Sequence, residues 1–215
     1  MNNYIIIAHR GITEIYNDNS LSSLLEIKKI KTNFKLGIEF DIQITKDNII
    51  ILYHDEFVMS GRVNDYTFFE IKKYNNNIIK LEELLNEFNN TEYLLDIEIK
   101  CYNSNDIINN INLVIDLVDK YNINYFYSSF SFDIVKKIKE KEKVIYFISE
   151  DLEDKNVDIT SYKLIDNFHN VKGVYTLYDN NFDESSIRKM LDNKINYFIT
   201  DDVEKTINYL SFITN

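Results

Sequence analysis

Residues 36–54 read LGIEFDIQITKDNIIILYH, two apolar runs joined by a short polar cluster at 46–48. Ile, Phe and Tyr favour strands, whereas Lys, Asp and Asn in succession favour a turn. The stretch therefore predicts a β-hairpin. Within its first arm, Glu39 and Asp41 are two residues apart, so both side chains point to the same face of the strand.

On both sides of this hairpin, strand-like runs alternate with segments that have apolar residues at helical spacing. Leaving out the second hairpin arm, eight strands remain, and this order predicts an α/β fold, a (β/α)8 TIM barrel with a hairpin extension after the second strand. An open, doubly wound sheet is the alternative that periodicity leaves open. The predicted strands are 4–8, 36–44, 49–54, 93–99, 123–128, 143–148, 157–160, 171–177 and 195–200. The predicted helices are 20–32, 81–89, 104–121, 131–141, 161–169, 184–193 and 203–211, with Ser20, Asp106, Ser131 and Asp183 or Ser185 as N-caps.

Two segments depart from this alternation. Residues 149–156 are too polar for a packed helix. Residues 55–80 form the longest stretch without a clear element, and we expect a loop over a site there. Because neither a linker nor a repeat is visible, we expect residues 1–215 to form a single domain.

Composition and charge exclude several classes of protein. The 215 residues carry a formal net charge of −11, from 35 acidic and 24 basic side chains. This balance argues against nucleic acid or an anionic membrane as the main partner, because both require a basic face. The one cysteine, Cys101, excludes an internal disulfide framework and a thiolate cluster for zinc.

The sequence also lacks the signals of secretion and membrane insertion. Its first residues have no basic lead and too short an apolar run for a signal peptide. The longest apolar candidate, 107–118, is interrupted by Asn109, Asn110, Asn112 and Asp116, so we expect no stable membrane insertion. The default expectation is a soluble, cytoplasmic protein. The helix surfaces show no clear apolar patch that would define an oligomer.

Ionisable residues follow several predicted strands at their carboxyl ends. The first strand ends in His9-Arg10-Gly11 and the second hairpin arm in His54-Asp55. In strand 93–99 and just beyond it, three ionisable residues share one face: Asp96, Glu98 and Lys100. Active sites of α/β barrels collect at the rim formed by the carboxyl ends of the strands.

The carboxylates of Glu39, Asp41 and Glu98 indicate a metal site. Three carboxylates in a partly enclosed mouth repel one another, and a divalent cation removes that repulsion. An all-oxygen set suits Mg²⁺ or Ca²⁺, whereas zinc would usually bring more His or Cys. The alternative is that these residues are solvated charges at strand ends.

His9 and His54 are candidates for acid–base chemistry because imidazole takes up and releases protons near neutral pH. With two imidazoles flanking one phosphorus, one accepts the nucleophile's proton and the other protonates the leaving alkoxide. Arg10 and Lys100 would neutralise a phosphate, Arg with a bidentate fork. A purely structural role is the alternative for each histidine alone.

Short motifs recur in a fixed order along nearly the whole chain, and together they resemble the motifs of the glycerophosphodiester phosphodiesterase family. They are His9-Arg10-Gly11, Asp18-Asn19-Ser20, Gly37-Ile38-Glu39-Phe40-Asp41, His54-Asp55, Leu81-Glu82-Glu83, Glu98-Ile99-Lys100, Ser129-Phe130 and Ile199-Thr200-Asp201.

The resemblance implies a TIM barrel that hydrolyses glycerophosphodiesters to sn-glycerol 3-phosphate and an alcohol such as choline or ethanolamine. It implies one divalent cation, Mg²⁺ or Ca²⁺, and a small phosphodiester as the partner. By motif, the roles are a catalytic acid–base pair at His9 and His54, metal ligands at Glu39, Asp41 and Glu98, phosphate contacts at Arg10 and Lys100, and substrate-pocket positions at Ser129 and Tyr175.

The chain departs from the family pattern in three places. Asp18 stands where the family has Glu, and the family's Trp-Thr-Val-Asn reads Tyr175-Thr176-Leu177-Tyr178. The segment after His54 is shorter than in members with an inserted cap. Two alternatives therefore remain: phospholipase-D-like action on lysophospholipids or sphingolipids, and a non-catalytic barrel that binds phosphate or a cation.

Overall fold

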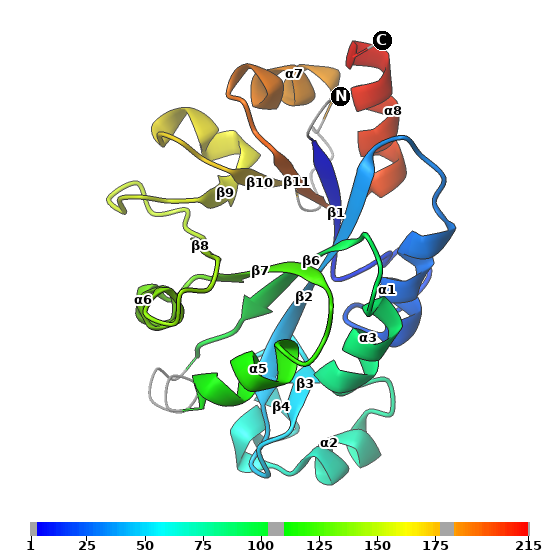
Figure 1. The fold of residues 1–215 in the computed structure, drawn as a ribbon, viewed down its shortest axis with the longest axis vertical. Helices are drawn as coiled ribbons and strands as arrows, with labels where there is room; N and C mark the ends of the chain where they lie inside the picture. Colours follow the sequence, from blue (N-terminus) through cyan, green and yellow to red (C-terminus); the bar gives the residue numbers. More distant parts are fainter. Residues whose placement is uncertain (1–3, 103–109, 177–182, 215) are drawn as a thin grey trace.

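Eight parallel strands form the wall of a barrel in the order β8-β7-β6-β2-β1-β11-β10-β9. The computed structural model describes residues 4–102, 110–176 and 183–214 (Figure 1). The end strands β8 and β9 meet through a parallel bridge between Ile148 and Ile159, so the barrel is nearly closed. The TIM-barrel prediction is confirmed and the open sheet is wrong. The strands are β1 (Ile5–His9), β2 (Lys35–Ile44), β6 (Leu94–Ile99), β7 (Asn124–Ser129), β8 (Ile145–Phe147), β9 (Ile159–Ser161), β10 (Gly173–Thr176) and β11 (Tyr197–Thr200).

The predicted hairpin after the second strand is also present. β3 (Ile50–Leu52) pairs antiparallel with β2, with Ile44 opposite Ile50. Asn48 takes a positive φ of 61° in the turn, a conformation that Asn tolerates better than most residues.

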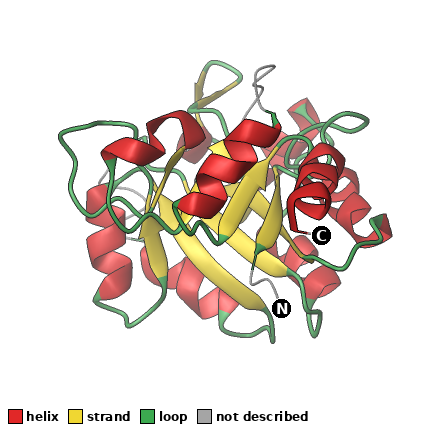
Figure 2. Ribbon diagram, turned by 90° about the horizontal axis from the view of Figure 1, so that it is seen from above, coloured by secondary structure: helices red, strands yellow, loops and turns green. Residues whose placement is uncertain are grey.

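Helices surround the barrel, as Figure 2 shows from above. Three predicted caps are confirmed: Ser20, Ser131 and Asp183 accept hydrogen bonds from the first turns of their helices. None of the helices in the described ranges is long and apolar enough to span a bilayer. The helices are α1 (Leu21–Glu26, continued by a 3-10 turn at Ile27–Lys29), α3 (Leu81–Phe88), α5 (Ile111–Val118), α6 (Phe132–Lys139), α7 (Glu184–Asp192) and α8 (Val203–Thr214).

The segment 55–80 is more structured than expected. It contains a small hairpin of β4 (Phe57–Val58) and β5 (Gly61–Arg62), a 3-10 turn at Val63–Asp65, and helix α2 (Phe68–Tyr74). The expectation of a loop was wrong because Thr67 and Glu70 form a reciprocal capping box that starts α2.

Other boundaries also differ from the prediction. The helix predicted at 161–169 is a 3-10 helix at Tyr162–Asn167, and 149–156 contains no helix, as expected. Residues 104–109 of the helix predicted at 104–121, including the predicted cap Asp106, lie outside the described residues. The same holds for Leu177, the last residue of a predicted strand.

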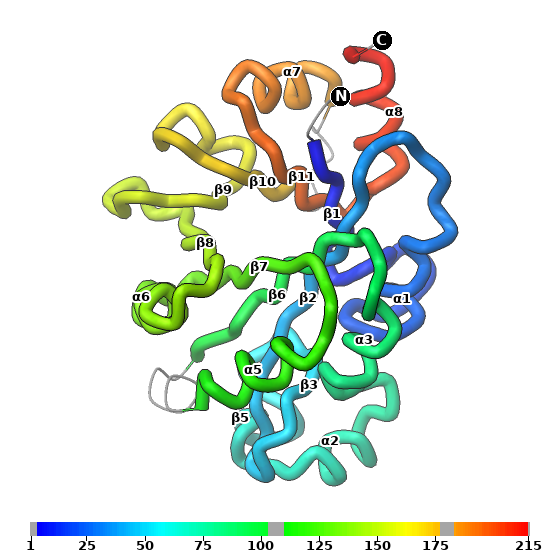
Figure 3. The backbone as a smooth tube through the Cα atoms, viewed as in Figure 1, coloured from blue at the N-terminus to red at the C-terminus, as the bar shows by residue number. Residues whose placement is uncertain are grey.

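Figure 3 follows the chain around the barrel and shows β1 beside β11. These two strands, the first and the last in the chain, pair in parallel. Outside the wall, strands and helices share a large apolar core that includes Ile6, Ile38 and Ile97. Inside, a smaller core contains Ile7, Phe126, Ile148, Ile159 and Ile199. Every second residue of a strand faces inward, so the inward faces continue toward the carboxyl ends of the strands in ionisable residues. His9 lies two residues after Ile7, and Asp201 lies two residues after Ile199.

Candidate active site

A cavity of about 500 Å³ opens at the carboxyl ends of the barrel strands. Its wall contains both predicted histidines, both predicted phosphate contacts and two of the three predicted metal ligands. These residues are His9, His54, Arg10, Lys100, Glu39 and Glu98.

The three predicted metal ligands lie together at the base of this cavity. Glu39, Asp41 and Glu98 each offer a carboxylate oxygen, and these oxygens lie within 4.8 Å of one another. Neighbouring strands bring them together, because Asp41 on β2 is paired with Glu98 on β6. All three are buried, with at most 7% of any residue exposed.

Burial and mutual repulsion shift the pKa values of these carboxyls in different directions. Burial, with the charges of Asp41 and Glu98, raises the pKa of Glu39 well above its ordinary value. Burial likewise raises the pKa of Glu98, to about 7. Burial also acts to raise the pKa of Asp41, but the Lys100 ammonium and the Arg10 guanidinium outweigh it and leave that pKa lowered.

Two cations hold Asp41 in its charged form. Lys100 Nζ lies 2.9 Å from Asp41 Oδ1 and 2.5 Å from Glu98 Oε1. Arg10 Nε lies 3.2 Å from Asp41 Oδ2. Despite its burial, which opposes a charge, Lys100 has a raised pKa because it contacts these two carboxylates.

The donor set fits a hard divalent cation. Glu39 Oε1 is buried and has no hydrogen-bond partner within the described part of the chain. An unpartnered carboxylate oxygen in a buried position is costly unless a cation or proton reaches it. These three carboxylates, Glu39, Asp41 and Glu98, are called the acidic trio below. They are a candidate site for Mg²⁺ or Ca²⁺.

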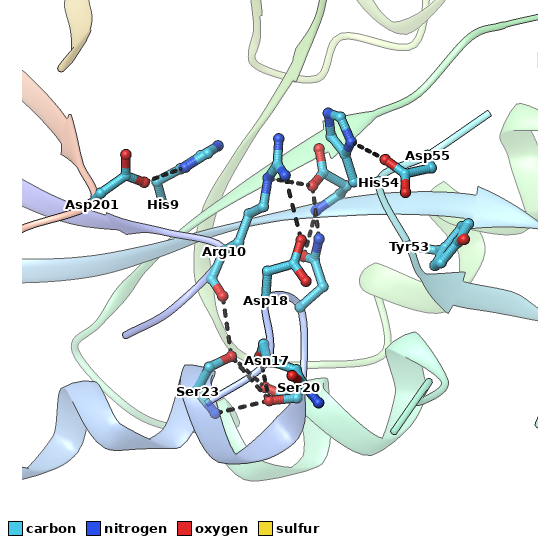
Figure 4. A network of polar contacts seen from close by, with 12 residues as sticks. His9, Arg10, Asn17, Asp18, Ser20, Ser23, Tyr53, His54, Asp55 and Asp201 are labelled. Atoms are coloured by element: carbon cyan, nitrogen blue, oxygen red, sulfur yellow. Dashed lines mark hydrogen bonds and ion pairs between the residues drawn. The ribbon is translucent and has the colours of Figure 1, made fainter. Parts of the chain in front are cut away.

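His9 is held by a carboxylate that lies far away in the sequence, Asp201. Its Nδ1 lies 2.7 Å from Oδ1 of Asp201, which follows β11, and Figure 4 shows this pair. Its Nε2 lies 3.9 Å from Glu39 Oε2. Since a carboxylate only accepts hydrogen bonds, Nδ1 donates to Asp201 and Nε2 is left to face the acidic trio.

His54 lies in the same cavity on the segment after β3. Its Nδ1 is 2.8 Å from Asp55 Oδ1. Burial lowers the pKa of His54, and the opposing charge of Asp41 does not restore it. The imidazole is therefore biased toward its neutral form.

The backbone after β1 requires glycine at position 11. Arg10 has a positive φ of 54°, and its N–H donates to Glu39 Oε2 at 2.9 Å. Gly11 also has a positive φ, 87°, and a Cβ there would lie 2.5 Å from the backbone of Ser23. Glycine is needed at this position because both the conformation and the space exclude a side chain.

Three residues at the site were not assigned a role from the sequence: Asp201, Asn19 and Asp96. Asn19 has a positive φ of 53° and makes two hydrogen bonds with Asp41, from its Nδ2 to Oδ2 at 2.8 Å and from Asp41 N to its Oδ1 at 3.1 Å. Asp96 is fully buried and accepts from Ser128 Oγ. The signals were the motif that contains Asn19, the alternation that puts Asp96 on the same strand face as Glu98, and the strand end that precedes Asp201.

The two predicted substrate-pocket residues are placed differently. Tyr175 lines the cavity. Ser129 is fully buried, and its hydroxyl donates to Ile99 O at 2.8 Å and accepts from Ser131 N at 3.1 Å. Its neighbour Phe130 lines the cavity instead. Leu177 and Tyr178, which complete the Tyr175 motif, lie outside the described residues.

A parallel (β/α)8 barrel with an acidic centre and two histidines at its carboxyl rim defines a class of protein, the TIM-barrel domains with a candidate metal-binding site. Residues 9–196 match the model of the glycerophosphoryl diester phosphodiesterase family. The chain belongs to this family.

Curated relatives match over part of their length. The chain is 30% identical over 112 residues to a glycerophosphodiester phosphodiesterase of Caldanaerobacter subterraneus subsp. tengcongensis, which is 45% of each protein. It is 38% identical over 74 residues to glycerophosphodiester phosphodiesterase 1 of Homo sapiens, which is 32% of this chain and 22% of the human protein. The chain thus spans less than half the length of these relatives.

Solved structures share the fold over nearly the whole chain. A glycerophosphodiester phosphodiesterase from Parabacteroides distasonis superposes with a TM-score of 0.76 at 22% identity, covering 100% of this chain and 99% of that one. An Oleispira antarctica phosphodiesterase in complex with the product sn-glycerol-3-phosphate superposes with a TM-score of 0.73 at 18% identity, covering 98% and 96%.

Proposed function

We propose that this chain is a metal-dependent phosphodiesterase that hydrolyses glycerophosphodiesters to sn-glycerol 3-phosphate and an alcohol. The observation that carries the proposal is that His9 and His54 line one cavity together with Glu39 and Glu98 of the acidic trio. The family and the product held by the Oleispira antarctica relative support the choice of substrate.

In this proposal, Glu39, Asp41 and Glu98 hold one Mg²⁺ or Ca²⁺. When bound, the ion supplies positive charge that polarises the phosphate and offsets the negative charge of the transition state. Lys100 and Arg10 add positive charge at the same place, and the fork of Arg10 suits two phosphate oxygens.

The two histidines move the protons. One imidazole takes the proton of the attacking hydroxyl as its oxygen bonds to phosphorus, and the other protonates the oxygen of the departing alcohol as its bond to phosphorus breaks. His9, held by Asp201, presents Nε2 to the cavity. His54, whose pKa is lowered by burial, is available as a neutral base near pH 7.

The test is product release from glycerophosphocholine, followed by ³¹P NMR, with Mg²⁺, with Ca²⁺ and with EDTA. We expect metal-dependent appearance of sn-glycerol 3-phosphate that EDTA abolishes and added metal restores. Binding of metal and substrate without turnover would favour the non-catalytic barrel. Release only from lysophosphatidylcholine would favour the phospholipase-D-like alternative.

A further inference from the structure

The backbone around His54 is held by side chains. Gln43 Nε2 donates to Tyr53 O at 3.0 Å and to Asp55 O at 2.8 Å. The hydroxyl of Tyr102 donates to His54 O at 2.5 Å. Three successive carbonyls, those of residues 53, 54 and 55, are therefore bound by two side chains just beyond the end of β3.

The two donors lie on, or just after, the strands that carry the acidic trio. Gln43 lies on β2 two residues after Asp41, on the same face of the strand. Tyr102 lies two residues after Lys100, beyond the end of β6. The backbone N–H of Tyr53 also donates to Asp41 O at 3.0 Å. His54 is thus fixed to the same two segments that position the metal ligands.

We propose that Gln43 and Tyr102 are positioning residues that hold the His54 imidazole at the acidic centre. The two Gln43 hydrogen bonds fix the carbonyls on either side of His54, those of Tyr53 and Asp55. The Tyr102 hydrogen bond fixes the His54 carbonyl between them. The ring itself is held by Asp55, whose own backbone is one of the groups that Gln43 binds. This proposal rests on the proposed function for its effect on turnover.

The physical reason for an effect on rate is geometric. His54 follows β3 on a segment outside regular secondary structure, so strand pairing alone does not fix its carbonyl. An acid–base group must lie within hydrogen-bond reach of the proton that it transfers, and a displacement of about 1 Å can cost on the order of 10²-fold in rate.

The variants are Tyr102→Phe and Gln43→Met, which keep the shape of each side chain and remove the donor. Tyr102 is 39% exposed, so its hydroxyl can be removed with little cost to the fold. Tyr125→Phe is the matched control, since that hydroxyl donates to Asp119 at the other end of the barrel. We expect Tyr102→Phe and Gln43→Met each to lower kcat about tenfold at nearly constant KM, and the control to change neither.

A double-mutant cycle with His54→Ala separates positioning from a general structural role. If Gln43 and Tyr102 act through His54, their substitution costs nothing further once the imidazole is gone. An additional tenfold loss in the His54→Ala background would overturn the proposal, because it would show that the donors act elsewhere.

A second readout does not depend on turnover. The chain has three histidines, so imidazole NMR signals are few and can be assigned by single substitutions. We expect Tyr102→Phe to shift or broaden the His54 ring signals and to leave those of His169 unchanged. Unchanged His54 signals would overturn the positioning role, whereas a wild-type protein without turnover would contradict the proposed function alone.

Discussion

The ring nitrogen Nδ1 of His9 lies 2.7 Å from Oδ1 of Asp201, although 192 positions separate the two residues in the chain. The contact exists because β1 and β11 are parallel neighbours, with Ala8 opposite Thr200, so that the residues that come next in the chain, His9 and Asp201, reach the same rim. Pairing of the first and last strands thus provides His9 with its carboxylate partner.

Replacing Asp201 with Asn should lower kcat about 10²-fold, since the carboxylate that accepts the hydrogen bond from His9 Nδ1 and orients the ring is lost. The neighbouring Asp202→Asn is the control. Asp202 Oδ1 accepts from Lys205 N at the start of α8, and an amide oxygen replaces it well there. Steady-state kinetics and thermal melting of both variants check the prediction, and equal losses of activity in both would contradict it.

Replacing Glu39 with Gln should weaken binding of Mg²⁺ or Ca²⁺ by at least tenfold, because one of three charged ligands becomes a neutral amide. Isothermal titration calorimetry measures the change directly. Glu82→Gln, on α3 and remote from the trio, removes the same charge and should leave the affinity unchanged. Wild-type affinity in Glu39→Gln would remove Glu39 from the ligand set.

The metal-free protein should lose stability as the pH rises from about 5 to about 7. The folded-state pKa of Glu98 is raised from 4.5 to about 7 by burial and by Asp41. Between these values the folded state binds more protons than the unfolded state, so the free energy of unfolding falls with pH. Melting temperatures in EDTA should show this decrease, and Glu98→Gln should flatten it.

Added Mg²⁺ should oppose that loss at the upper end of the range, because deprotonated carboxylates bind the cation more strongly. A melting temperature that rises steadily to pH 7 in EDTA would contradict the assignment of Glu98 as a buried, repelled carboxyl. So would the same slope in the wild type and in Glu98→Gln.

Gly37→Ala should destabilise the barrel by about 1–3 kcal/mol. A Cβ at Gly37 would lie 2.5 Å from the backbone oxygen of Leu94 on the neighbouring strand β6, and backbone cannot move aside cheaply. At Gly61 a Cβ would first meet the end of the Asp65 side chain, at 2.8 Å, which can move at the cost of the hydrogen bond that it accepts from Arg62 N. Gly61→Ala should therefore cost much less, as urea denaturation would show.

Much of the fold could be predicted because strand signals in this chain are strong and local. Runs rich in Ile, Phe and Tyr marked the barrel strands, and the period of two put Glu39 and Asp41 on one face. Helix α2 was missed because its sequence, FFEIKKY, is only seven residues long, although the capping box of Thr67 and Glu70 was a local signal for its start.

The parts of the site that could not be predicted depend on the register between strands. The pairing of His9 with Asp201 requires knowing that the first and last strands are neighbours. Asp96 and Asn19 became significant only through what they contact. The orientation of Ser129 also depends on the strand: Ser128 shares the inward face with Phe126, so the hydroxyl of Ser129 points out of the barrel, toward Ser131.

The most direct test of the central claim is turnover of glycerophosphocholine by His9→Ala and His54→Ala at saturating Mg²⁺, with His169→Ala as the matched control. His169 is an exposed residue beyond the 3-10 helix and outside the cavity lining. We expect each of the first two variants to remain folded and to lose at least about 10²-fold in kcat, while the control keeps wild-type activity. Near wild-type turnover in either His9→Ala or His54→Ala would contradict this claim.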